Sequence, residues 1–441
     1  MQRALVVLIA AASLALATSA ATSVKTASGF VSGIRGRDAA ITVFKGIPFA
    51  APPTGSLRWQ APAAAASWQD VRVADTFSPS CIQTIVTEKK PWTYELMAHG
   101  DLSEDCLYLN VWSPDVSARA GRPVLIYIYG GGNVEGSGSV PAYDGEGLAS
   151  KGLVVVTFNY RVGVLGFFAH PELARAAGYH ASGNYGLLDQ IAAVRWVHDN
   201  IAAFGGDPAR ITIAGQSAGA GAVHSLTASP LARGLFHRAI ADSGAAITGT
   251  RTMADQEADG VRFAAAKGAT SIAALRAMGW QQVVEPVPGV RFGPLPDGYA
   301  LPSTVREIFA AAKQNDVPML TGINADEGGA VPNPTTTLES FERDAKQRYG
   351  DAAAEFLKLY PAATDDEAKR AQNDSARDRA RATLYFWALD RARTSRTSLF
   401  TYFWTHALPG PDASQYGAFH TSEVPYVLNT LSRSQRPFAA A

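Results

Sequence analysis

The chain has 441 residues, of which 47% are hydrophobic and 18% are charged. This composition is typical of a globular protein with enough mass for a large core, which needs no metal ion or dense disulfide network to fold. Its 39 basic residues balance its 39 acidic residues, so the overall charge gives no reason to expect nucleic acid or an anionic membrane as the partner. A neutral small-molecule substrate fits this balance better.

The first twenty residues have the pattern of an export signal. Arg3 is followed by an apolar run from Leu5 to Ala17, and either Ala15-Leu16-Ala17 or Thr18-Ser19-Ala20 offers small residues for cleavage. The run is shorter than the roughly 20 apolar residues that a membrane-spanning helix needs, and no later stretch reaches that length. We therefore expect residues 1–20 to be a signal peptide, the mature chain to be secreted or periplasmic, and no segment to span a membrane.

The chain has two cysteines, Cys81 and Cys106. In a cytosolic protein, two unrelated buried thiols would be the default interpretation. Export to an oxidising compartment changes that expectation, so we predict that these two residues form a disulfide. Closing a loop of this length should stabilise the fold by roughly 3 kcal/mol in the chain-entropy model.

Short apolar runs rich in β-branched residues recur along the chain and predict strands. These runs cover residues 124–129, 153–158, 211–214, 317–321 and 399–404. Continuous apolar runs suit strands that are covered on both faces, as in a mostly parallel sheet. The regions 250–310 and 361–396 are predicted to be helical excursions instead.

A helix is predicted between the second and the third of these strands. Leu187, Ile191, Val194 and Ile201 share one helical face, and the pattern ends at Gly205. Strands that alternate with helices indicate an α/β architecture. No repeat or low-complexity linker divides the mature chain, so we expect a single domain over residues 21–441.

A G-x-S-x-G motif, Gly215 to Gly219, follows the predicted strand at 211–214. A nucleophile elbow needs this context, because the serine sits on a sharp turn where flanking side chains would collide. An ordinary strand-to-helix turn can carry the same letters. The preceding strand favours the elbow, which makes Ser217 the candidate nucleophile and requires a positioned base to activate it.

In proteins with such an elbow, the acid and then the histidine follow the serine along the chain. His406 comes directly after the predicted strand at 399–404 and is interpreted as a packing or surface residue. His420 lies in a loop, where a general base is expected. Asp326 and Glu327 both leave a buried strand, and either could orient the imidazole, although a solvated turn would also suit them.

Three glycines, Gly130 to Gly132, follow the predicted strand at 124–129. They resemble the HGGG-type element that supplies oxyanion donors together with the amide after the nucleophile, here that of Ala218. A flexible loop or a phosphate cradle could also contain three glycines. The cradle is discounted, because the lysine and the Ser/Thr of a P-loop are missing.

Taken together, these segments resemble the type-B carboxylesterase family, which includes the cholinesterases and several bacterial esterases. Further segments over most of the mature chain carry the resemblance, namely 44–53, 103–110, 159–167, 184–190 and 200–208. The family implies an α/β-hydrolase fold, with a large, mostly parallel central sheet and helices on both faces. It also implies a serine carboxylesterase that forms an acyl-enzyme on the triad Ser217, Glu327 and His420, with Glu327 rather than Asp326 as the acid.

The resemblance further implies that the oxyanion donors are the amides of Gly131, Gly132 and Ala218. It implies no metal and no organic cofactor, and a small-molecule ester as the partner. It places the Cys81–Cys106 pair around a loop beside the entrance of the active-site gorge.

Other positions acquire expected roles through the same resemblance. Arg58 and Glu104 fall where the family has a structural ion pair, and Ser243 falls near the acid. Trp92 and Tyr94 fall in the loop at the gorge entrance. A single tryptophan in a loop is more often packing or rim, so cation recognition of the cholinesterase kind is not expected.

The chain departs from the family pattern in several places. Gln216 replaces a glutamate before the serine, Tyr129 replaces a frequent histidine before the glycines, and Thr421 replaces a glycine after His420. Neither Gln216 nor Tyr129 is expected to carry the chemistry. Only residues 421–441 follow the histidine, where the family continues into a further helical segment, so we expect a C-terminal truncation with apolar surface exposed.

Two other functions compete with ester hydrolysis. Some relatives in the superfamily keep the fold as a binding or adhesion domain and lose the triad, whereas all three triad positions are filled here. The same triad can also cleave amides or lactones. Acyl-chain and alcohol preference depend on pocket shape, and neither they nor the oligomeric state is readable from the sequence.

Overall fold

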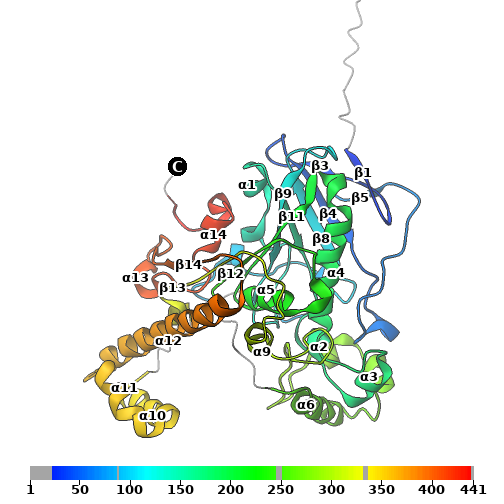
Figure 1. Cartoon of the computed structure of the whole chain (residues 1–441). Helices are drawn as coiled ribbons and strands as arrows, with labels where there is room; N and C mark the ends of the chain where they lie inside the picture. The colour runs from blue at the N-terminus through cyan, green and yellow to red at the C-terminus, as the bar shows by residue number, and fades with distance from the viewer. Residues whose placement is uncertain (1–21, 87–88, 245–250, 331–335, 439–441) are drawn as a thin grey trace, which may run out of the picture.

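A computed structural model of the chain describes residues 22–86, 89–244, 251–330 and 336–438 (Figure 1). The predicted signal peptide, residues 1–20, lies outside the described residues. Of the helices in the described ranges, none combines the length and the apolar character that crossing a membrane would require.

The centre of the molecule is a nine-stranded sheet with the order β14-β13-β12-β11-β9-β10-β8-β4-β3. Its strands are β3 (Ile34–Arg35), β4 (Thr42–Pro48), β8 (Tyr108–Ser113), β9 (Arg122–Ile128), β10 (Val154–Phe158), β11 (Gly206–Gln216), β12 (Arg238–Asp242), β13 (Met319–Asn324) and β14 (Leu399–Trp404). The strands from β14 to β10 are parallel to one another, and β8, β4 and β3 continue the sheet in antiparallel pairs. The prediction of a large, mostly parallel sheet is therefore confirmed.

All five strands predicted from apolar runs are present, and β14 has the predicted bounds. β10 shows why these runs were readable, since every one of its residues is buried between two layers of helices. The pattern did not single out β4, β8 or β12. β12 begins with Arg238 and ends with Asp242, so only three apolar residues remain to mark it as a strand.

Helices cover both faces of the sheet, and the pair α4 (Tyr185–Asn200) and α5 (Ala218–Ala228) lies on one of them. α5 packs on β11 and β12, and α1 (Glu146–Ala149) packs on β8 and β10 on the other side of the central strands (Figure 1). The predicted helix between the second and third strands is confirmed. Its helical turns end at Phe204, where Gly205 takes a left-handed φ of 80°.

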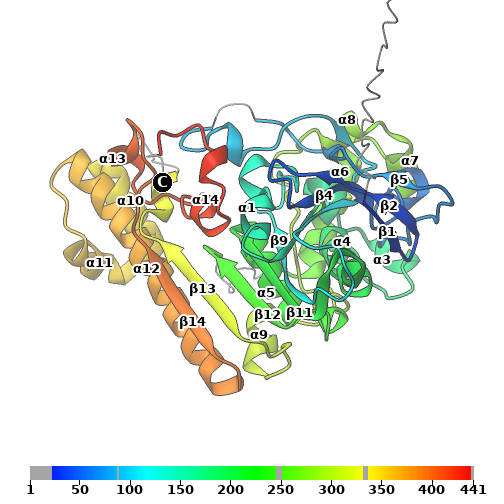
Figure 2. The ribbon, with the colours of Figure 1, turned by 90° about the horizontal axis from the view of Figure 1, so that it is seen from above.

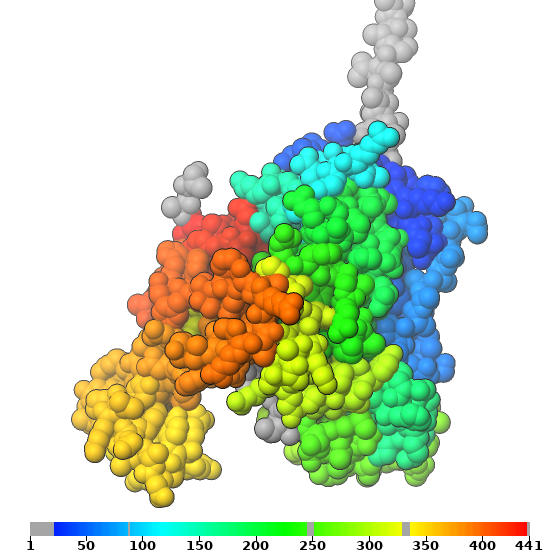
Figure 3. All heavy atoms as spheres, in the orientation of Figure 1, coloured from blue at the N-terminus to red at the C-terminus, as the bar shows by residue number. Residues whose placement is uncertain are grey.

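The two regions predicted as helical excursions do contain helices. The first holds α6 (Met253–Ala266), α7 (Ile272–Ala277), α8 (Trp280–Val284) and α9 (Val305–Ala310), and the second holds the 30-residue α12 (Asp365–Thr394). With α10 (Leu338–Tyr349) and α11 (Ala353–Leu359), the first turns of α12 project from the body of the molecule, at the lower left of Figures 1 and 3. Figure 2 shows α12 running beneath β14 at one end of the sheet.

The described residues also form shorter α-helices and strands. They are α2 (Gly163–Phe167), α3 (Pro171–Ala176), α13 (Ala413–Tyr416), α14 (Val424–Val427), the strands β1 (Ser23–Thr26), β2 (Gly29–Ser32) and β5 (Arg72–Val73) of a small sheet, and the paired strands β6 (Ser80–Cys81) and β7 (Leu102–Ser103). Cys81, the last residue of β6, forms a disulfide with Cys106, which follows β7. We call residues 81–106 the disulfide loop, of which 87–88 are not described.

A buried ion pair ties the loop after β10 to α4. Both oxygens of Asp189 accept hydrogen bonds from the Arg161 guanidinium, at 2.7 and 2.8 Å, and one of them also accepts from the Arg161 backbone amide. Neither side chain is more than 4% exposed. Buried charges persist when they are paired and hydrogen-bonded in this way, so the pair holds the carboxyl end of β10 in place.

Candidate active site

Ser217 lies between the end of β11 and the start of α5, where the chain turns sharply. Its φ of 60° and ψ of −123° are strained for a residue with a side chain, and its amide donates to the Asp242 carbonyl at 2.8 Å. A Cβ at Gly215 would lie 2.6 Å from the backbone of Gly219, and a Cβ at Gly219 would lie 2.1 Å from the Ile128 carbonyl oxygen. The two motif glycines are therefore required by close approach of the backbone, as a nucleophile elbow predicts.

His420 and Glu327 meet at the carboxyl end of the sheet. His420 lies in the loop between α13 and α14, and Glu327 begins a short helix, η6 (Glu327–Ala330), soon after β13. One oxygen of the Glu327 carboxylate contacts His420 Nδ1 at 2.5 Å. The other oxygen accepts a hydrogen bond from the backbone amide of Asn324 at 2.8 Å. Asp326 instead accepts from the Ala418 amide at 2.8 Å, so the adjacent carboxylates face different partners.

The electrostatics of His420 suit a base that carries a proton during the reaction. Burial alone would lower the pKa of His420, but the hydrogen bond and charge of Glu327, with the charge of Glu423, raise it above its ordinary value. Burial also raises the pKa of Glu423 to about 7, against a hydrogen bond from Asn324 that lowers it. Glu327 and Glu423 therefore both favour the imidazolium form of His420.

Gln216, the residue before Ser217, is a neighbour of His420. Its Nε2 lies 3.3 Å from His420 Nδ1 and 3.2 Å from His420 Nε2. An atom at these two distances cannot lie in the ring plane without overlapping a ring carbon, so the amide packs on the face of the imidazole. Gln216 is not expected to carry the chemistry, and this contact places it beside the imidazole without contradicting that expectation.

The glycine-rich loop from Gly130 to Gly136 follows β9 and faces the elbow. Gly131 and Gly132 have φ values of 108° and 63°, which residues with side chains rarely adopt. A Cβ at Gly131 would lie 2.2 Å from the Glu135 carbonyl oxygen. Ala218 is the first residue of α5, so its amide has no partner within the helix and is free to act as a donor.

Gln83 clamps this glycine-rich loop to the disulfide loop. Its side chain donates to the Gly136 carbonyl at 2.8 Å and to the Cys81 carbonyl at 2.9 Å, and accepts from the Gly136 amide at 2.7 Å. The side chain is buried, with a relative exposure of 6%. No pattern within the sequence marked Gln83, because its partner lies 53 residues away.

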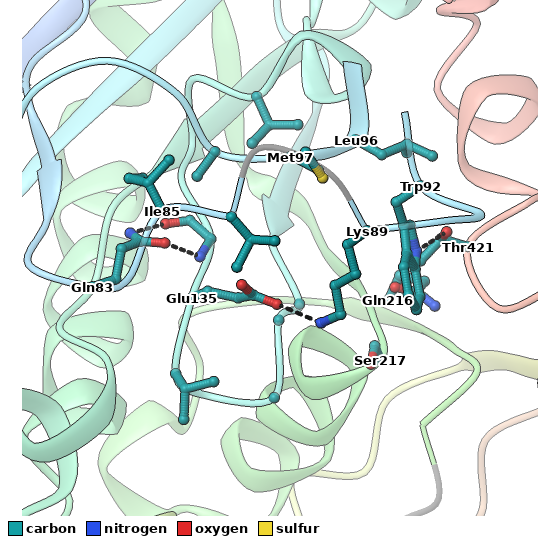
Figure 4. A pocket seen from close by; sticks show the side chains of 18 of the residues that line it. Gln83, Ile85, Lys89, Trp92, Leu96, Met97, Glu135, Gln216, Ser217 and Thr421 are labelled. Carbon is teal, nitrogen blue, oxygen red and sulfur yellow. Dashed lines mark hydrogen bonds and ion pairs between the residues drawn. The ribbon is translucent and has the colours of Figure 1, made fainter. Parts of the chain in front are cut away.

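The elbow, the glycine-rich loop and the disulfide loop surround one cavity of about 270 Å³ (Figure 4). Ser217, His420, Gly131 and Gly132 all line it. The cavity therefore brings together the predicted nucleophile, the predicted base and two predicted oxyanion donors. Its lining also includes apolar side chains of the disulfide loop, namely Ile85, Val86, Trp92, Leu96 and Met97.

The residues predicted at the entrance divide into two groups. Trp92 lines the cavity and donates from its indole nitrogen to the Thr421 hydroxyl at 2.8 Å, which ties the disulfide loop to the residue after His420. Tyr94 is 53% exposed, stacks on His99 and is not among the residues that line the cavity. The threonine that replaces a glycine after the histidine thus has a partner of its own.

The other residues considered from the sequence lie outside the lining of the main cavity. Arg58 and Glu104 form a two-pronged ion pair at 2.6 and 2.7 Å outside the main cavity. Ser243 follows β12 and, with Glu327, lines a second cavity of about 180 Å³. His406 is exposed and contacts the Tyr426 hydroxyl at 2.8 Å, as expected of a surface histidine. Within the described residues, no cluster of three or more His, Cys, Asp or Glu side chains is arranged to hold a metal ion.

The sequence is similar to those of known proteins over most of its length. The family model described as "Carboxylesterase family" matches residues 20–440. Fumonisin B1 esterase of Sphingopyxis macrogoltabida is 39% identical over 93% of this chain and 75% of its own length. Liver carboxylesterase of Sus scrofa is 37% identical over 78% of this chain and 65% of its own length. Para-nitrobenzyl esterase of Bacillus subtilis is 33% identical over 89% of this chain and 80% of its own length. The chain thus spans between 65% and 80% of the length of these three relatives.

Proposed function

This chain belongs to the carboxylesterase family and so to the serine hydrolases of carboxylic esters, and on that basis we propose that it cleaves them through an acyl-enzyme formed on Ser217. One observation carries the assignment of the residues. The 2.5 Å contact between Glu327 and His420 Nδ1 orients the imidazole in the cavity that Ser217 also lines. All three positions of the triad are filled, which argues against a non-catalytic binding domain.

In the proposed reaction, Ser217 Oγ attacks the ester carbonyl while His420 Nε2 takes the hydroxyl proton. Glu327 holds Nδ1–H and stabilises the imidazolium that forms. The imidazolium then gives its proton to the leaving alcohol, which leaves the acyl group on Ser217. A water molecule, deprotonated by the now neutral His420, attacks the acyl carbonyl. The imidazolium then returns this proton to Ser217 Oγ as the bond to the acyl group breaks, which releases the carboxylic acid and restores the enzyme.

The negative charge that develops on the carbonyl oxygen requires backbone donors in fixed positions. We assign this role to the amides of Gly131, Gly132 and Ala218. The local geometry supports this assignment. Gln83 hydrogen-bonds Gly136 and so fixes the end of the glycine-rich loop, and Ala218 is fixed as the first residue of α5. The proposed chemistry uses no metal and no organic cofactor.

The location of the reaction is also proposed. The signal-like residues 1–20 support export, and a disulfide between Cys81 and Cys106 is compatible with an oxidising compartment. N-terminal sequencing of protein recovered from the periplasm or the medium tests the export. A protein recovered there should begin after Ala17 or after Ala20, and retention of Arg3 in it would contradict the assignment.

The test of the reaction is the variant Ser217→Ala assayed on short-chain aryl esters. We expect kcat to fall by about 10⁴-fold or more, because the nucleophile is lost while the fold remains. Para-nitrobenzyl esters and fumonisin B1 join the substrate panel, because relatives are named for them.

A fluorophosphonate probe gives an independent measurement. Digestion and mass spectrometry of labelled wild-type protein should place the label on Ser217. The variant Ser243→Ala changes a serine that does not line the main cavity, and it should still be labelled. Wild-type turnover in Ser217→Ala, or a label on another serine, contradicts the proposal.

A further inference from the structure

Two opposite charges lie on the wall of the active-site cavity. Lys89 belongs to the disulfide loop and Glu135 to the glycine-rich loop, and their ammonium and carboxylate groups are 3.1 Å apart. Figure 4 shows this contact at the cavity that also contains Ser217. We call Lys89 and Glu135 the rim pair.

The rim pair accounts for the formal charge of the cavity wall. Among the described residues that line the cavity, Lys89 is the only lysine or arginine and Glu135 is the only aspartate or glutamate. The other described lining residues are apolar, glycine, uncharged polar side chains and His420. A substrate in the cavity therefore meets either a neutralised pair or, if the pair separates, two uncompensated charges.

Both members of the pair are held in place by further contacts. The Lys89 ammonium lies 5.2 Å from the centre of the Trp92 ring, which favours a cation at that point. The Glu135 amide donates to the Gly131 carbonyl at 3.1 Å, so its backbone belongs to the loop that supplies the proposed oxyanion donors. Neutralising one member would therefore leave the charge of the other beside the substrate.

Charge on a cavity wall selects among charged substrates by direct attraction and repulsion. Two opposite charges in contact largely cancel at the distance of a bound ester, whereas a single charge does not. The side chains are 48% and 30% exposed, so solvent screens them and the effect of one unmasked charge should be about three- to tenfold.

We propose that the rim pair makes this esterase selective for uncharged esters, and that each member alone would turn the selectivity toward substrates of the opposite charge. The inference rests on the proposed function, since it concerns groups that approach Ser217. It identifies the substrate class as esters whose acyl or alcohol group is neutral and mainly apolar. It also makes Lys89 and Glu135 specificity-determining residues.

The experiment compares three esters with one leaving group and with acyl chains of equal length that end in a neutral, an anionic or a cationic group. The measurement is kcat/KM for each ester, expressed as a ratio to the neutral ester within the same variant. The proteins are the wild type, Lys89→Met, Glu135→Gln and the double variant. Ratios within one variant remain interpretable if a substitution changes overall activity.

The wild type should prefer the neutral ester to both charged esters. Lys89→Met should raise the cationic ratio by about three- to tenfold and lower the anionic ratio, because Glu135 is left unpaired. Glu135→Gln should do the opposite, and the double variant should return both ratios toward those of the wild type. High salt should weaken the changes. Lys90→Met removes a neighbouring lysine outside the cavity lining and should leave all ratios unchanged.

Three results would overturn the inference. One is a wild type that prefers a charged ester, the second is a pair of single variants that shift the ratios in the same direction, and the third is ratios that do not change at all. Failure of the proposed function looks different, because it would abolish fluorophosphonate labelling of Ser217 and cleavage of the neutral ester. If the neutral ester is cleaved and the ratios stay fixed, only the inference about the rim pair fails.

Discussion

Asp326 and Glu327 are neighbours in the chain with the same charge, yet they face different partners. Asp326 also pairs through its backbone with the loop that carries His420, since its amide donates to the Ala418 carbonyl at 3.1 Å. Glu327 starts the η6 turn, which directs its carboxylate to the imidazole instead. One residue thus attaches the histidine loop to β13 and the next orients the histidine itself.

The pH dependence of the reaction follows from the environment of His420. A general base must be neutral to accept a proton, and Glu327 and Glu423 raise the pKa of His420 above 6.5 against the opposing effect of burial. We therefore expect kcat/KM to rise with pH through an apparent pKa above that value. A pH profile of kcat/KM at constant ionic strength measures this apparent pKa. A rise of kcat/KM centred below pH 6.5 would contradict the assignment.

The variant Glu327→Gln should move this rise of kcat/KM to lower pH. Glutamine can still contact Nδ1, but it removes the charge that favours the imidazolium, so the pKa of His420 falls. We also expect kcat to fall by about 10²- to 10⁴-fold, because the tautomer and the imidazolium are less well supported. Asp326→Asn is the matched control. The Asp326 carboxylate accepts from the Ala418 amide and does not contact the ring, so in this variant kcat/KM should rise at the same pH as in the wild type.

Among the elements, the disulfide loop connects parts of the site that are distant in sequence. Gln83 hydrogen-bonds Gly136, and Trp92 hydrogen-bonds Thr421, so the loop holds both the glycine-rich loop and the loop of the proposed base. The disulfide closes the ends of this loop, whose cysteines are 25 positions apart. The loop is thus a structural cover for the cavity as well as part of its lining.

Removal of the disulfide should therefore cost stability. In the double variant Cys81→Ala/Cys106→Ala, we expect the free energy of unfolding to fall by about 3 kcal/mol, because the unfolded chain gains freedom. Urea denaturation measures this change. A reducing agent should lower the stability of the wild type in the same direction and leave the double variant unaffected. A denaturation midpoint equal to that of the wild type would contradict the prediction.

For the molecule as a whole, the sheet has two very different ends. At one edge, the described sheet ends in the antiparallel strands β8, β4 and β3. At the other edge, it ends in the parallel strand β14. Phe400 and Phe403 on β14 are 59% and 43% exposed, and Tyr385 and Phe386 on the neighbouring α12 are 60% and 61% exposed. An edge strand with exposed aromatic side chains favours self-association.

The variant Phe400→Lys should reduce this tendency. A charge on the edge strand opposes pairing with a second strand, so we expect a larger soluble fraction and less light scattering after heating. Gln281→Lys adds the same charge to an exposed site on α8 and serves as the control. If both variants change solubility equally, net charge rather than the sheet edge is responsible.

Local patterns were enough to predict the α/β class, because buried parallel strands need continuous apolar runs and a helix needs its own spacing. They were also enough to predict the elbow at Ser217, because a sharp turn needs glycine on both sides of the serine. β12 escaped prediction, since its three central apolar residues are too few to distinguish a strand.

The choice between Asp326 and Glu327 required the family resemblance, and its geometric reason depends on how β13 pairs with the loop before α14. The contacts of Gln83 with Gly136, of Lys89 with Glu135 and of Gln216 with His420 were not predictable. Each joins residues that are 46 to 204 positions apart, and their meeting depends on how separate loops pack at the end of the sheet. Local spacing carries no information about that packing, because it results from burial and hydrogen bonding across the whole fold.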